Sequence, residues 1–355
     1  MKSNYTVIGM MSGTSLDGVD VAVCSFFKNN SIWGYDLLHS KTFLYENYWK
    51  KALKGAPNLN SEELAKMDRI YGDYLGHIVN TSVEESGIKS DLVASHGHTI
   101  FHKPDEGYSL QIGHGANITT VTGLDVVSDF RSTDIANGGQ GAPLVPVGDK
   151  LLFGNYQACL NLGGFSNISF DFHGKRLAFD VCPVNIVLNY YANKLGHEYD
   201  NGGIIGMKGK VSIPLLNRLN SMPYYSETPP KSLSREWIET ELLHVMESVN
   251  CSLEDKLCTF YQHISNQIVT TFVKYDLHDI LVTGGGVHNG YLMQMLIENS
   301  TARLKKPDSK TIDYKEAIVF AFLGLLRYLG QINCYASVTG AKSDTVCGSL
   351  YCGQK

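Results

Sequence analysis

The sequence predicts an α/β protein built from two domains. Near its start, residues 5–8 and 19–26 are apolar runs, and the second has valine at positions 19, 21 and 23, a period of two that is typical of a strand. A tip rich in glycine, serine and threonine joins the two runs, so together they predict a β-hairpin. The same order of strand, glycine tip and strand returns about 150 residues later, at residues 158–172. Two such hairpins in two halves predict paired α/β domains that face each other across a cleft.

Length and composition are typical of a folded protein with two domains. The chain has 355 residues, of which 43% are hydrophobic and 18% are charged. A formal net charge of −5 argues against a nucleic-acid partner or an anionic membrane surface. The eight cysteines include no CxxC pair, the N-terminus has no signal-peptide pattern, and the longest apolar stretch, residues 317–326, is too short to span a bilayer. We therefore expect a cytoplasmic protein.

The elements of the first 125 residues follow from the spacing of apolar side chains. Residues 61–85 carry them at i, i+3 and i+4, which predicts an amphipathic helix. A strand then leads into residues 95–99, and a short strand follows. Residues 124–145 are dense in Asp, Asn, Gly and Gln, so we expect a long loop-rich passage there, of the kind that usually carries function.

After the second hairpin, residues 279–283 predict a short buried strand that leads into three glycines and then a helix. Residues 314–329 are apolar nearly all round, which predicts a buried helix. The expected domains are residues 1–125 at the N-terminus and 126–336 at the C-terminus. The last segment, 337–355, is a candidate to return to the first domain.

The first glycine tip has the composition of a phosphate-binding loop. Its glycines let backbone N–H groups approach phosphate oxygens closely, and its hydroxyl groups add donors. Its two carboxylates suit a metal ion or a hydroxyl group better than a phosphate, and a solvated hairpin turn is the alternative. The absence of GxxxxGK[ST] and GxGxxG patterns disfavours P-loop kinases and dehydrogenases. The residues of this tip are Gly13, Thr14, Ser15, Leu16, Asp17, Gly18, Val19 and Asp20.

Three glycine-rich loops follow one another as in the sugar kinase/heat-shock 70/actin superfamily, which the chain resembles. Within that superfamily, the chain from residue 7 to residue 352 resembles the anhydro-N-acetylmuramic acid kinase family. Two strings are specific to the family: Ser-Gly-Thr-Ser-Leu-Asp-Gly at 12–18 and Gly-Gly-Gln-Gly-Ala-Pro-Leu at 138–144. Further similar strings lie at residues 95–99, 129–134, 161–168, 283–289 and 315–317.

The resemblance implies a two-lobed actin-like/sugar kinase (ribonuclease H-like) fold with an ATP cleft between the lobes. It also implies a reaction in which water opens the 1,6-anhydro ring of anhydro-N-acetylmuramic acid and ATP phosphorylates O6. The product is N-acetylmuramic acid 6-phosphate, in peptidoglycan recycling. Phosphoryl transfer depends chiefly on positioning and charge neutralisation, which glycine tips and Mg²⁺ supply. The resemblance favours a homodimer.

Asp180 is the candidate catalytic base. It ends the apolar strand 177–179, where desolvation raises the pKa of a carboxylate. By resemblance, it matches the aspartate that activates the attacking water. The family pattern Asp-Thr-Gly-Pro-Gly-Asn here reads Asp-Val-Cys-Pro-Val-Asn at residues 180–185, so both glycines are replaced. The alternative is that Asp180 caps a helix that begins near Pro183.

The resemblance assigns nucleotide contacts to all three loops. Thr14 and Ser15 are expected at the γ-phosphate, and Asp17 is expected to hold Mg²⁺ through water. The second and third loops are expected at the β-phosphate and under the adenosine, although a tight turn without a ligand is the alternative for the third. Their residues are Gly163, Gly164, Asn167, Gly284, Gly285 and Gly286.

The resemblance also implies five sugar contacts, namely His96, Arg131, Asp134, Gln140 and Glu316. The planar fork of Arg131 suits the lactyl carboxylate of a muramic acid, and an Arg131–Asp134 contact inside the loop is the alternative. Glu316 is expected in the first turn of the last helix, where the helix dipole alone favours a carboxylate. The neighbouring histidines have no metal-site spacing and are expected to be structural: His98, His102 and His114.

Two other functions are compatible with these loops. Another sugar or carboxylate kinase of the same fold would need no hydrolytic base. A nucleotide-binding regulator would lack turnover altogether. The presence of Asp180, Arg131 and Glu316 together favours the anhydrosugar kinase.

Overall fold

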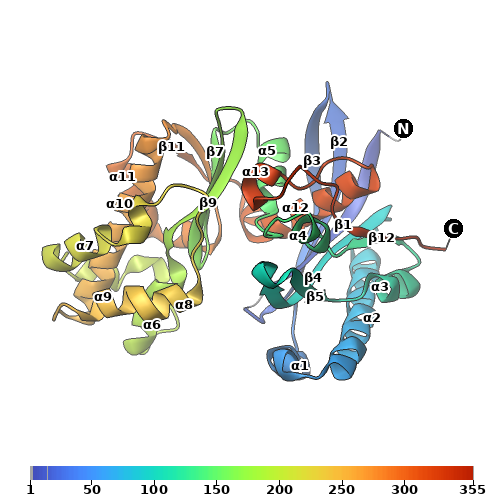
Figure 1. Cartoon of the computed structure of the whole chain (residues 1–355), viewed down its shortest axis with the longest axis horizontal. Helices are drawn as coiled ribbons and strands as arrows, with labels where there is room; N and C mark the ends of the chain where they lie inside the picture. The colour runs from blue at the N-terminus through green and yellow to red at the C-terminus, as the bar shows by residue number, and fades with distance from the viewer. Residues whose placement is uncertain (1–2, 14, 355) are drawn as a thin grey trace. The chain divides into compact units, whose positions relative to one another are not determined.

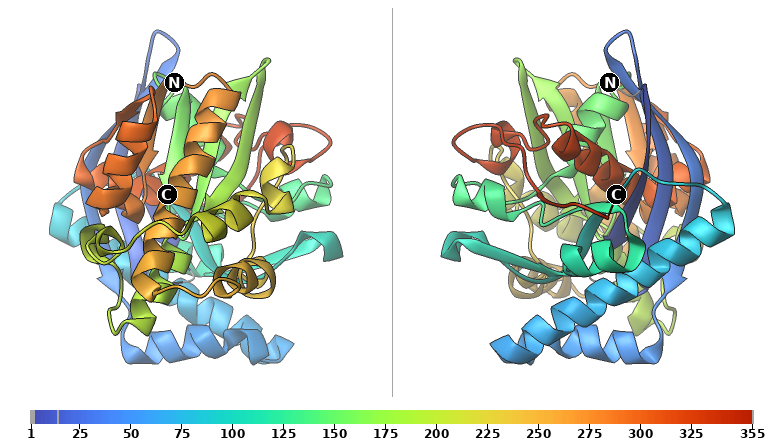
Figure 2. Two further views of the ribbon diagram at one scale, coloured as in Figure 1. Left: turned by 90° about the vertical axis from the view of Figure 1, so that its left-hand side faces the viewer. Right: turned by 90° about the vertical axis from the view of Figure 1, so that its right-hand side faces the viewer.

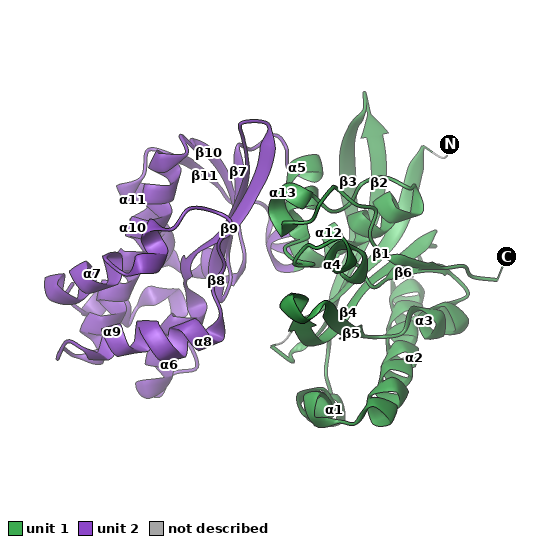
Figure 3. Ribbon diagram, in the orientation of Figure 1, with its two compact units in different colours: residues 1–152, 314–355 green, residues 153–313 purple. Residues whose placement is uncertain are grey.

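The computed structural model describes residues 3–13 and 15–354. Contacts divide the chain into two compact units, coloured separately in Figure 3. Unit 1 comprises residues 1–152 and 314–355, and unit 2 comprises residues 153–313. Each unit is built on its own β-sheet, as Figure 1 shows, so the prediction of two α/β domains is confirmed.

Unit 1 contains a seven-stranded sheet in the order β12-β6-β4-β1-β2-β3, with β5 paired to β4. The first predicted hairpin is confirmed, because β1 and β2 pair antiparallel from Ser12 opposite Val19 to Asn4 opposite Phe27. β1 also pairs parallel with β4, and β4 with β6. The strands are β1 (Asn4–Ser12), β2 (Gly18–Asn29), β3 (Ile32–Leu44), β4 (Leu92–Lys103), β5 (Tyr108–Ile112), β6 (Asp125–Ser128) and β12 (Ser349–Tyr351).

Helices cover both faces of this sheet, because alternate residues of the strands belong to different cores. Val21 and Val23 of β2 pack with α2, which is light blue in Figure 2, whereas Ala22 and Cys24 pack with α12. The predicted helix at 61–85 is confirmed as α2, with a capping box between Asn60 and Glu63 at its start. The helices here are α1 (Asn47–Gly55), α2 (Ser61–Ser86), α3 (Gly115–Thr122), α4 (Ser132–Ala136), α5 (Val145–Leu152), α12 (Ser309–Tyr328) and α13 (Ala336–Thr339).

The predicted buried helix is α12, and it crosses the sheet at glycine positions. A Cβ atom added to Gly9 of β1 would lie 2.0 Å from the Ala317 carbonyl oxygen and 2.8 Å from the Ala321 Cβ atom. At Gly324 of α12, an added Cβ atom would lie 2.4 Å from the Ala94 Cβ atom of β4. The helix therefore lies close to the central strands, with no side chain larger than that of alanine at these contacts.

The unit boundaries differ from the expected domain limits of 125 and 336. Residues 126–152 and 314–336 belong to unit 1, because β6 pairs with β4 and α12 packs on the same sheet. Residues 337–355 also lie in this unit, where β12 pairs with β6. The passage 124–145, expected to lack regular structure, contains β6 and the short helix α4.

Unit 2 contains a five-stranded sheet in the order β11-β10-β7-β8-β9. The second predicted hairpin is confirmed as β7 and β8, which pair antiparallel. The strands are β7 (Ala158–Leu162), β8 (Phe165–Phe172), β9 (Lys175–Pro183), β10 (Asp279–Thr283) and β11 (Arg303–Lys305). The helices are α6 (Asn185–Lys194), α7 (Ile213–Asn220), α8 (Arg235–Trp237), α9 (Leu243–Glu247), α10 (Leu253–Lys274) and α11 (Gly290–Asn299).

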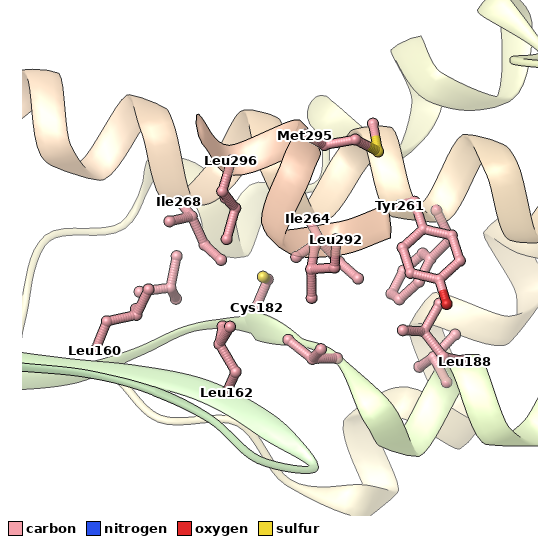
Figure 4. Close-up of a cluster of buried hydrophobic side chains, with 14 of the residues drawn as sticks. Leu160, Leu162, Cys182, Leu188, Tyr261, Ile264, Ile268, Leu292, Met295 and Leu296 are labelled. Atoms are coloured by element: carbon pink, nitrogen blue, oxygen red, sulfur yellow. The ribbon is translucent and has the colours of Figure 1, made fainter. Parts of the chain in front are cut away.

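The core of unit 2 lies between this sheet and helices α10 and α11. Figure 4 shows Leu160 and Leu162 of β7 facing Ile264 and Ile268 of α10, with Cys182 of β9 among them. Among the described residues, no helix is both long and apolar enough to cross a membrane.

We expect Gly9→Val to destabilise unit 1 strongly, because the new side chain meets the backbone of α12, which cannot rotate away. Overpacking of this kind costs about 3 kcal/mol or more when backbone must move. Urea denaturation with a fluorescence or circular dichroism readout measures the loss. Gly55→Ala is the matched control, since an added Cβ atom there has no neighbour within 4 Å. Equal stability of Gly9→Val and the wild type would contradict the described crossing.

Candidate functional site

The first glycine tip joins β1 to β2 and is held at its base. The Asp17 carbonyl oxygen accepts a hydrogen bond from the Tyr45 amide at 3.0 Å. At Gly18, an added Cβ atom would lie 2.4 Å from the Phe43 carbonyl oxygen, so packing against β3 requires glycine there. Ser15 and Asp17 are exposed, whereas the Val19 side chain is in the core. Thr14 lies outside the described residues.

Three features of this tip bear on ligand binding. Leu16 has a φ of 61°, a left-handed conformation uncommon for a residue with a side chain. Gly13 leaves its surroundings open, with only the Ser15 side chain near an added Cβ atom. Asp20 accepts a hydrogen bond from the Thr42 hydroxyl at 2.6 Å, so it is tied to β3. The exposed carboxylate of Asp17 is the one positioned to meet an ion at the tip.

A buried polar network lies directly before the tip, and the sequence prediction missed it. The Ser12 hydroxyl is 2.6 Å from the Tyr45 hydroxyl and 2.8 Å from His98 Nδ1. The Tyr45 hydroxyl in turn contacts that of Tyr71 at 2.5 Å. Burial lowers the pKa of His98 to about 4, so the ring is neutral and structural at neutral pH. A serine as the last residue of an apolar strand was the available signal.

His96 and Arg131 form a hydrogen-bonded pair in unit 1. The Arg131 guanidinium donates from Nη2 to His96 Nε2 at 2.8 Å and from Nη1 to the Gly141 carbonyl oxygen at 2.6 Å. His96 Nδ1 then donates to the Gly97 carbonyl oxygen at 3.0 Å. Burial, assisted by the charge of Arg131, lowers the pKa of His96 to about 3, so this histidine is a neutral acceptor.

Arg131 keeps both its charge and a spare donor. Burial lowers the pKa of its guanidinium to about 10, which leaves it protonated at neutral pH. Its Nε atom is buried and has no hydrogen-bond partner among the described residues. A buried donor of this kind costs free energy unless a ligand or water meets it. The structure therefore presents Arg131 as a candidate anion contact.

Asp134 holds the glycine loop rather than facing outward. Its carboxylate accepts hydrogen bonds from the Gly141 amide at 2.8 Å, the Thr339 hydroxyl at 2.8 Å and the Cys334 thiol at 3.1 Å. The side chain is fully buried. The hydrogen bonds of Asp134 connect Gly141 to Cys334 and Thr339 in the C-terminal segment. Asp134 therefore acts as a positioning residue in this arrangement.

Gln140 is carried by that loop. Its amide donates to the Thr339 carbonyl oxygen at 2.9 Å, and its side chain is exposed. The amides of the residues before and after Gln140 also donate to Asp134, so the backbone that carries this exposed carboxamide is held in place. This geometry is compatible with the expected sugar contact, because the anchored backbone limits where the side chain reaches.

Glu316 lies on α12 with charged neighbours. The protein packed around Glu316 raises the pKa of its carboxyl, and the positive charges of Lys315 and Arg131 act in the opposite direction. The residue is nevertheless exposed in the described structure. Lys315 is itself tied to Asp149 at 2.7 Å. The expected first-turn position is wrong, because α12 begins at Ser309, two turns earlier.

In unit 2, Asp180 lies within β9 opposite Asn167, since the strand runs on to Pro183 instead of ending at residue 179. One carboxylate oxygen, Oδ2, accepts a hydrogen bond from the Leu233 amide at 2.8 Å. Burial raises the pKa of Asp180, and the bond from Leu233 partly offsets that rise. The capping alternative is wrong, because α6 begins at Asn185 without a side-chain cap.

A crossing segment holds the main chain of Asp180. The Tyr224 hydroxyl donates to the Asp180 carbonyl oxygen at 2.6 Å, and the Asp180 amide donates to the Lys231 carbonyl oxygen at 3.3 Å. The Lys231 ammonium group donates to the Tyr224 carbonyl oxygen at 2.9 Å. This support from residues 224–233 was not predicted, because nothing local in the sequence links it to β9.

The second and third glycine loops lie together in unit 2. The Gly163 and Gly164 carbonyl oxygens accept hydrogen bonds from the first amides of α6, and Gly164 and Asn167 are exposed. Gly284 has a φ of 87°, and a Cβ atom there would lie 2.5 Å from Asn161 Oδ1. Gly286 packs equally closely on Leu162, whereas Gly285 is exposed with open space around it.

The residues at the three altered positions of the family pattern lie in the core of unit 2. Val181, Cys182 and Val184 are all buried, and Cys182 packs against β7 and α11 residues, as Figure 4 shows. Burial raises the pKa of the Cys182 thiol, so it is a neutral apolar side chain there. These side chains therefore fill the core of unit 2.

The donor set suits a metal carried by a nucleotide better than a protein-bound cage. Within residues 3–13 and 15–354, no three His, Cys, Asp or Glu side chains form a metal cluster. Mg²⁺ in kinases is usually held by phosphates, water and one or two carboxylates. The exposed Asp17 carboxylate fits that requirement.

Comparison with known proteins identifies one family. The family model of anhydro-N-acetylmuramic acid kinase matches residues 5–353. A protein of that name from Nitrosomonas europaea is 33% identical, over 97% of this chain and 99% of its own. Another from Shewanella baltica is 34% identical over 99% of both chains.

Solved structures are more distant. The activator of 2-hydroxyisocaproyl-CoA dehydratase from Clostridium difficile aligns with 90% of this chain and 94% of its own, at 12% identity and a TM-score of 0.44. The ROK hexokinase from Thermus thermophilus aligns with 90% and 99% at 10% identity and a TM-score of 0.38. These scores are too low to support an argument, and the assignment depends on the sequence relatives. On the length of those matches, the chain belongs to the anhydro-N-acetylmuramic acid kinase family.

Proposed function

We propose that this protein uses ATP and water to convert 1,6-anhydro-N-acetylmuramic acid into N-acetylmuramic acid 6-phosphate, as a step of peptidoglycan recycling. A water oxygen forms a bond to C1, the bond from C1 to O6 breaks, and O6 attacks the γ-phosphorus of ATP to release ADP. The observation that carries the proposal is the environment of Asp180. Its carboxylate is desolvated and oriented in a chain that matches the family from residue 5 to residue 353.

Asp180 acts as the general base in this proposal. The Leu233 amide holds Oδ2, which leaves Oδ1 to accept the proton of the attacking water. A carboxylate whose pKa is raised by burial is a stronger base than a solvated one. The bonds to Tyr224 and Lys231 hold the main chain at this point, so the direction of the carboxylate is defined.

Arg131 supplies the charge that recognises the acidic sugar. Its unpartnered Nε donor and its retained charge suit the lactyl carboxylate. His96 and Asp134 support this contact indirectly: His96 accepts from the guanidinium, and Asp134 holds the Gly141 amide. Gln140 and Glu316, both exposed, are the proposed partners of the sugar hydroxyl and acetamido groups.

The glycine loops bind the nucleotide in this proposal. The exposed, anchored tip that contains Ser15 meets the γ-phosphate, and Asp17 holds Mg²⁺ through water. Bound Mg²⁺ would neutralise charge on the phosphates during transfer. The exposed Gly164 and Asn167 meet the β-phosphate, and the open surface at Gly285 faces the adenosine. We also propose that the protein is cytoplasmic, because its cysteines form no CxxC pair, and that it is a homodimer, because the family resemblance favours one.

We expect Asp180→Asn to abolish most turnover, because asparagine cannot accept the proton of water. Loss of a general base lowers kcat by about 10²- to 10⁴-fold. A coupled ADP-release assay with Mg²⁺-ATP and 1,6-anhydro-N-acetylmuramic acid measures it, with open-ring N-acetylmuramic acid and N-acetylglucosamine as comparison acceptors. Asp276→Asn, at an exposed position of unit 2, serves as the control. Turnover with open-ring sugars that is indifferent to Asp180 would instead identify a general sugar kinase.

The pH profile provides an independent check on Asp180. The base works only when it is ionised, so the rate falls as pH falls through its pKa. Because burial raises that pKa, the acid limb of kcat should lie above about 4, the ordinary range of an aspartate. His96 should contribute no limb above pH 5, since its pKa is lowered to about 3. An acid limb at or below the ordinary aspartate range would argue against a desolvated base.

Arg131→Lys should separate sugar binding from nucleotide binding. Lysine keeps the charge but loses the planar fork held by His96 and Gly141, so the KM for the anhydrosugar should rise about tenfold or more. The KM for ATP should stay within about twofold, which is under 0.5 kcal/mol. Steady-state kinetics in each substrate measures both, with Arg303→Lys, an exposed arginine of β11, as control. An equal rise in both KM values would refute a specific sugar contact.

A further inference from the structure

Unit 2 contains a pocket of about 570 Å³ that none of the proposed catalytic residues lines. Its walls come from the end of α7, the turn around residues 223–226, the middle of α10 and the end of α11. Asn299 at the last residue of α11 is nine residues beyond the start of that helix, so the pocket lies at the opposite end from the Gly284–Gly286 loop. The volume is in the ordinary range for small-molecule sites.

The chemistry of this pocket is uncharged and polar. Seven of its eight lining residues carry a carboxamide or hydroxyl group, and the eighth is Val269. Four of the seven are carboxamides from three different helices: Asn220, Asn266, Gln267 and Asn299. Such a lining offers no charged side chain to an ion, but many sites for neutral hydrogen bonds.

Hydrogen bonds among the carboxamides determine which of their atoms remain available. Asn220 Oδ1 accepts hydrogen bonds from His263 Nδ1 at 2.7 Å and from Gln267 Nε2 at 3.1 Å. The Asn220 amide group and Gln267 Oε1 remain available to a ligand. Asn266 Oδ1 accepts from Gln262 at 2.9 Å, which leaves its amide group.

At the end of α11, Asn299 donates to Ser265 at 3.1 Å, which leaves its carbonyl oxygen. In total, two amide donors, on Asn220 and Asn266, and two carbonyl acceptors, on Gln267 and Asn299, remain available at the pocket. A sugar hydroxyl both donates and accepts, so this balance matches a polyhydroxylated ligand.

Tyr225 adds an observation that points to a ligand. It lines the pocket, and its hydroxyl oxygen is buried without a hydrogen-bond partner among the described residues. Its ring packs edge-on against the buried ring of His263, with 4.8 Å between centroids, so the side chain is held in place. The Nε2 atom of His263 is likewise buried and unpartnered within the described chain. Buried polar atoms without partners are uncommon, and a bound ligand or water would satisfy them.

We propose that this pocket is a second, non-catalytic binding site for a neutral sugar, of which an N-acetylated hexosamine is the best match. The acetamido group pairs with the free carboxamides, the hydroxyls meet the spare donors and acceptors, and one hydroxyl bonds to Tyr225. The proposal is independent of the proposed reaction. A ligand here would also stabilise the segment that holds Asp180. Tyr224 lies in the same turn as Tyr225 and donates to the Asp180 carbonyl oxygen.

Titration of the full chain with N-acetylglucosamine, without nucleotide or anhydrosugar, tests the proposal by calorimetry. Saturable binding is expected in the millimolar range, which is about 4 kcal/mol. Asn266→Ala and Tyr225→Phe should each weaken it about fivefold or more, the effect of one lost hydrogen bond. Gln294→Ala removes an exposed carboxamide of α11 outside the pocket and should leave binding unchanged.

The outcomes separate this site from the catalytic one. Binding that persists in saturating 1,6-anhydro-N-acetylmuramic acid supports a second site, whereas displacement by the anhydrosugar overturns it. Absence of saturable heat up to about 50 mM, a concentration corresponding to under 2 kcal/mol of affinity, also overturns it. So does equal weakening in Gln294→Ala. Thermal unfolding of each variant verifies that the altered chains are folded. None of these results depends on turnover, so they stand whether or not the proposed reaction is found.

Discussion

The close crossing of α12 over the central strands of unit 1 is the constraint on which much of the structure depends. Gly9 lets strand β1 approach the backbone of α12, and Gly324 lets the helix approach Ala94, so the helix lies deeper than larger side chains would allow. This depth buries the apolar side chains of residues 317–326 and brings the chain after residue 314 back to the first sheet. It also places Lys315 and Glu316 close to Asp149, Arg131 and Asp20, with Lys315 bonded to Asp149.

Hydrogen bonds satisfy most of the polar atoms of Arg131 and Asp134 in unit 1. Arg131 remains cationic among buried groups because His96 is neutral and accepts one of its N–H groups, while a backbone carbonyl accepts another. The buried carboxyl group of Asp134 accepts hydrogen bonds from an amide, a hydroxyl and a thiol. The Nε donor of Arg131 is buried without a hydrogen-bond partner among the described residues, and we propose that it binds the substrate.

In unit 2, the carboxylate of Asp180 is desolvated on strand β9. A segment about fifty residues further along the chain supports Asp180 by three hydrogen bonds, one to the side chain and two to the main chain. Tyr225, which directly follows Tyr224 in this segment, lines the carboxamide pocket. The turn at residues 223–226 therefore connects two distinct polar environments of this unit.

Local pattern alone determined several features of this protein. Valine alternation and a glycine tip predicted both hairpins, helical spacing predicted α2, and specific strings placed the chain in its family. These features are readable because period, turn chemistry and motif depend on residues close together in the sequence. Candidate residues such as Asp180 and Arg131 were found in the same way, through motifs.

Only the tertiary structure decided how those residues are used. Asp134 meets Thr339 across 205 positions, and Asp180 meets Leu233 across 53, so no local pattern reveals that one is a positioning residue and the other is not a helix cap. The return of residues 314–355 to unit 1, the Ser12 network and the carboxamide pocket likewise arise from contacts between distant segments. Burial, pKa and hydrogen-bond partners are properties of packing, and packing is settled only when the whole chain has folded.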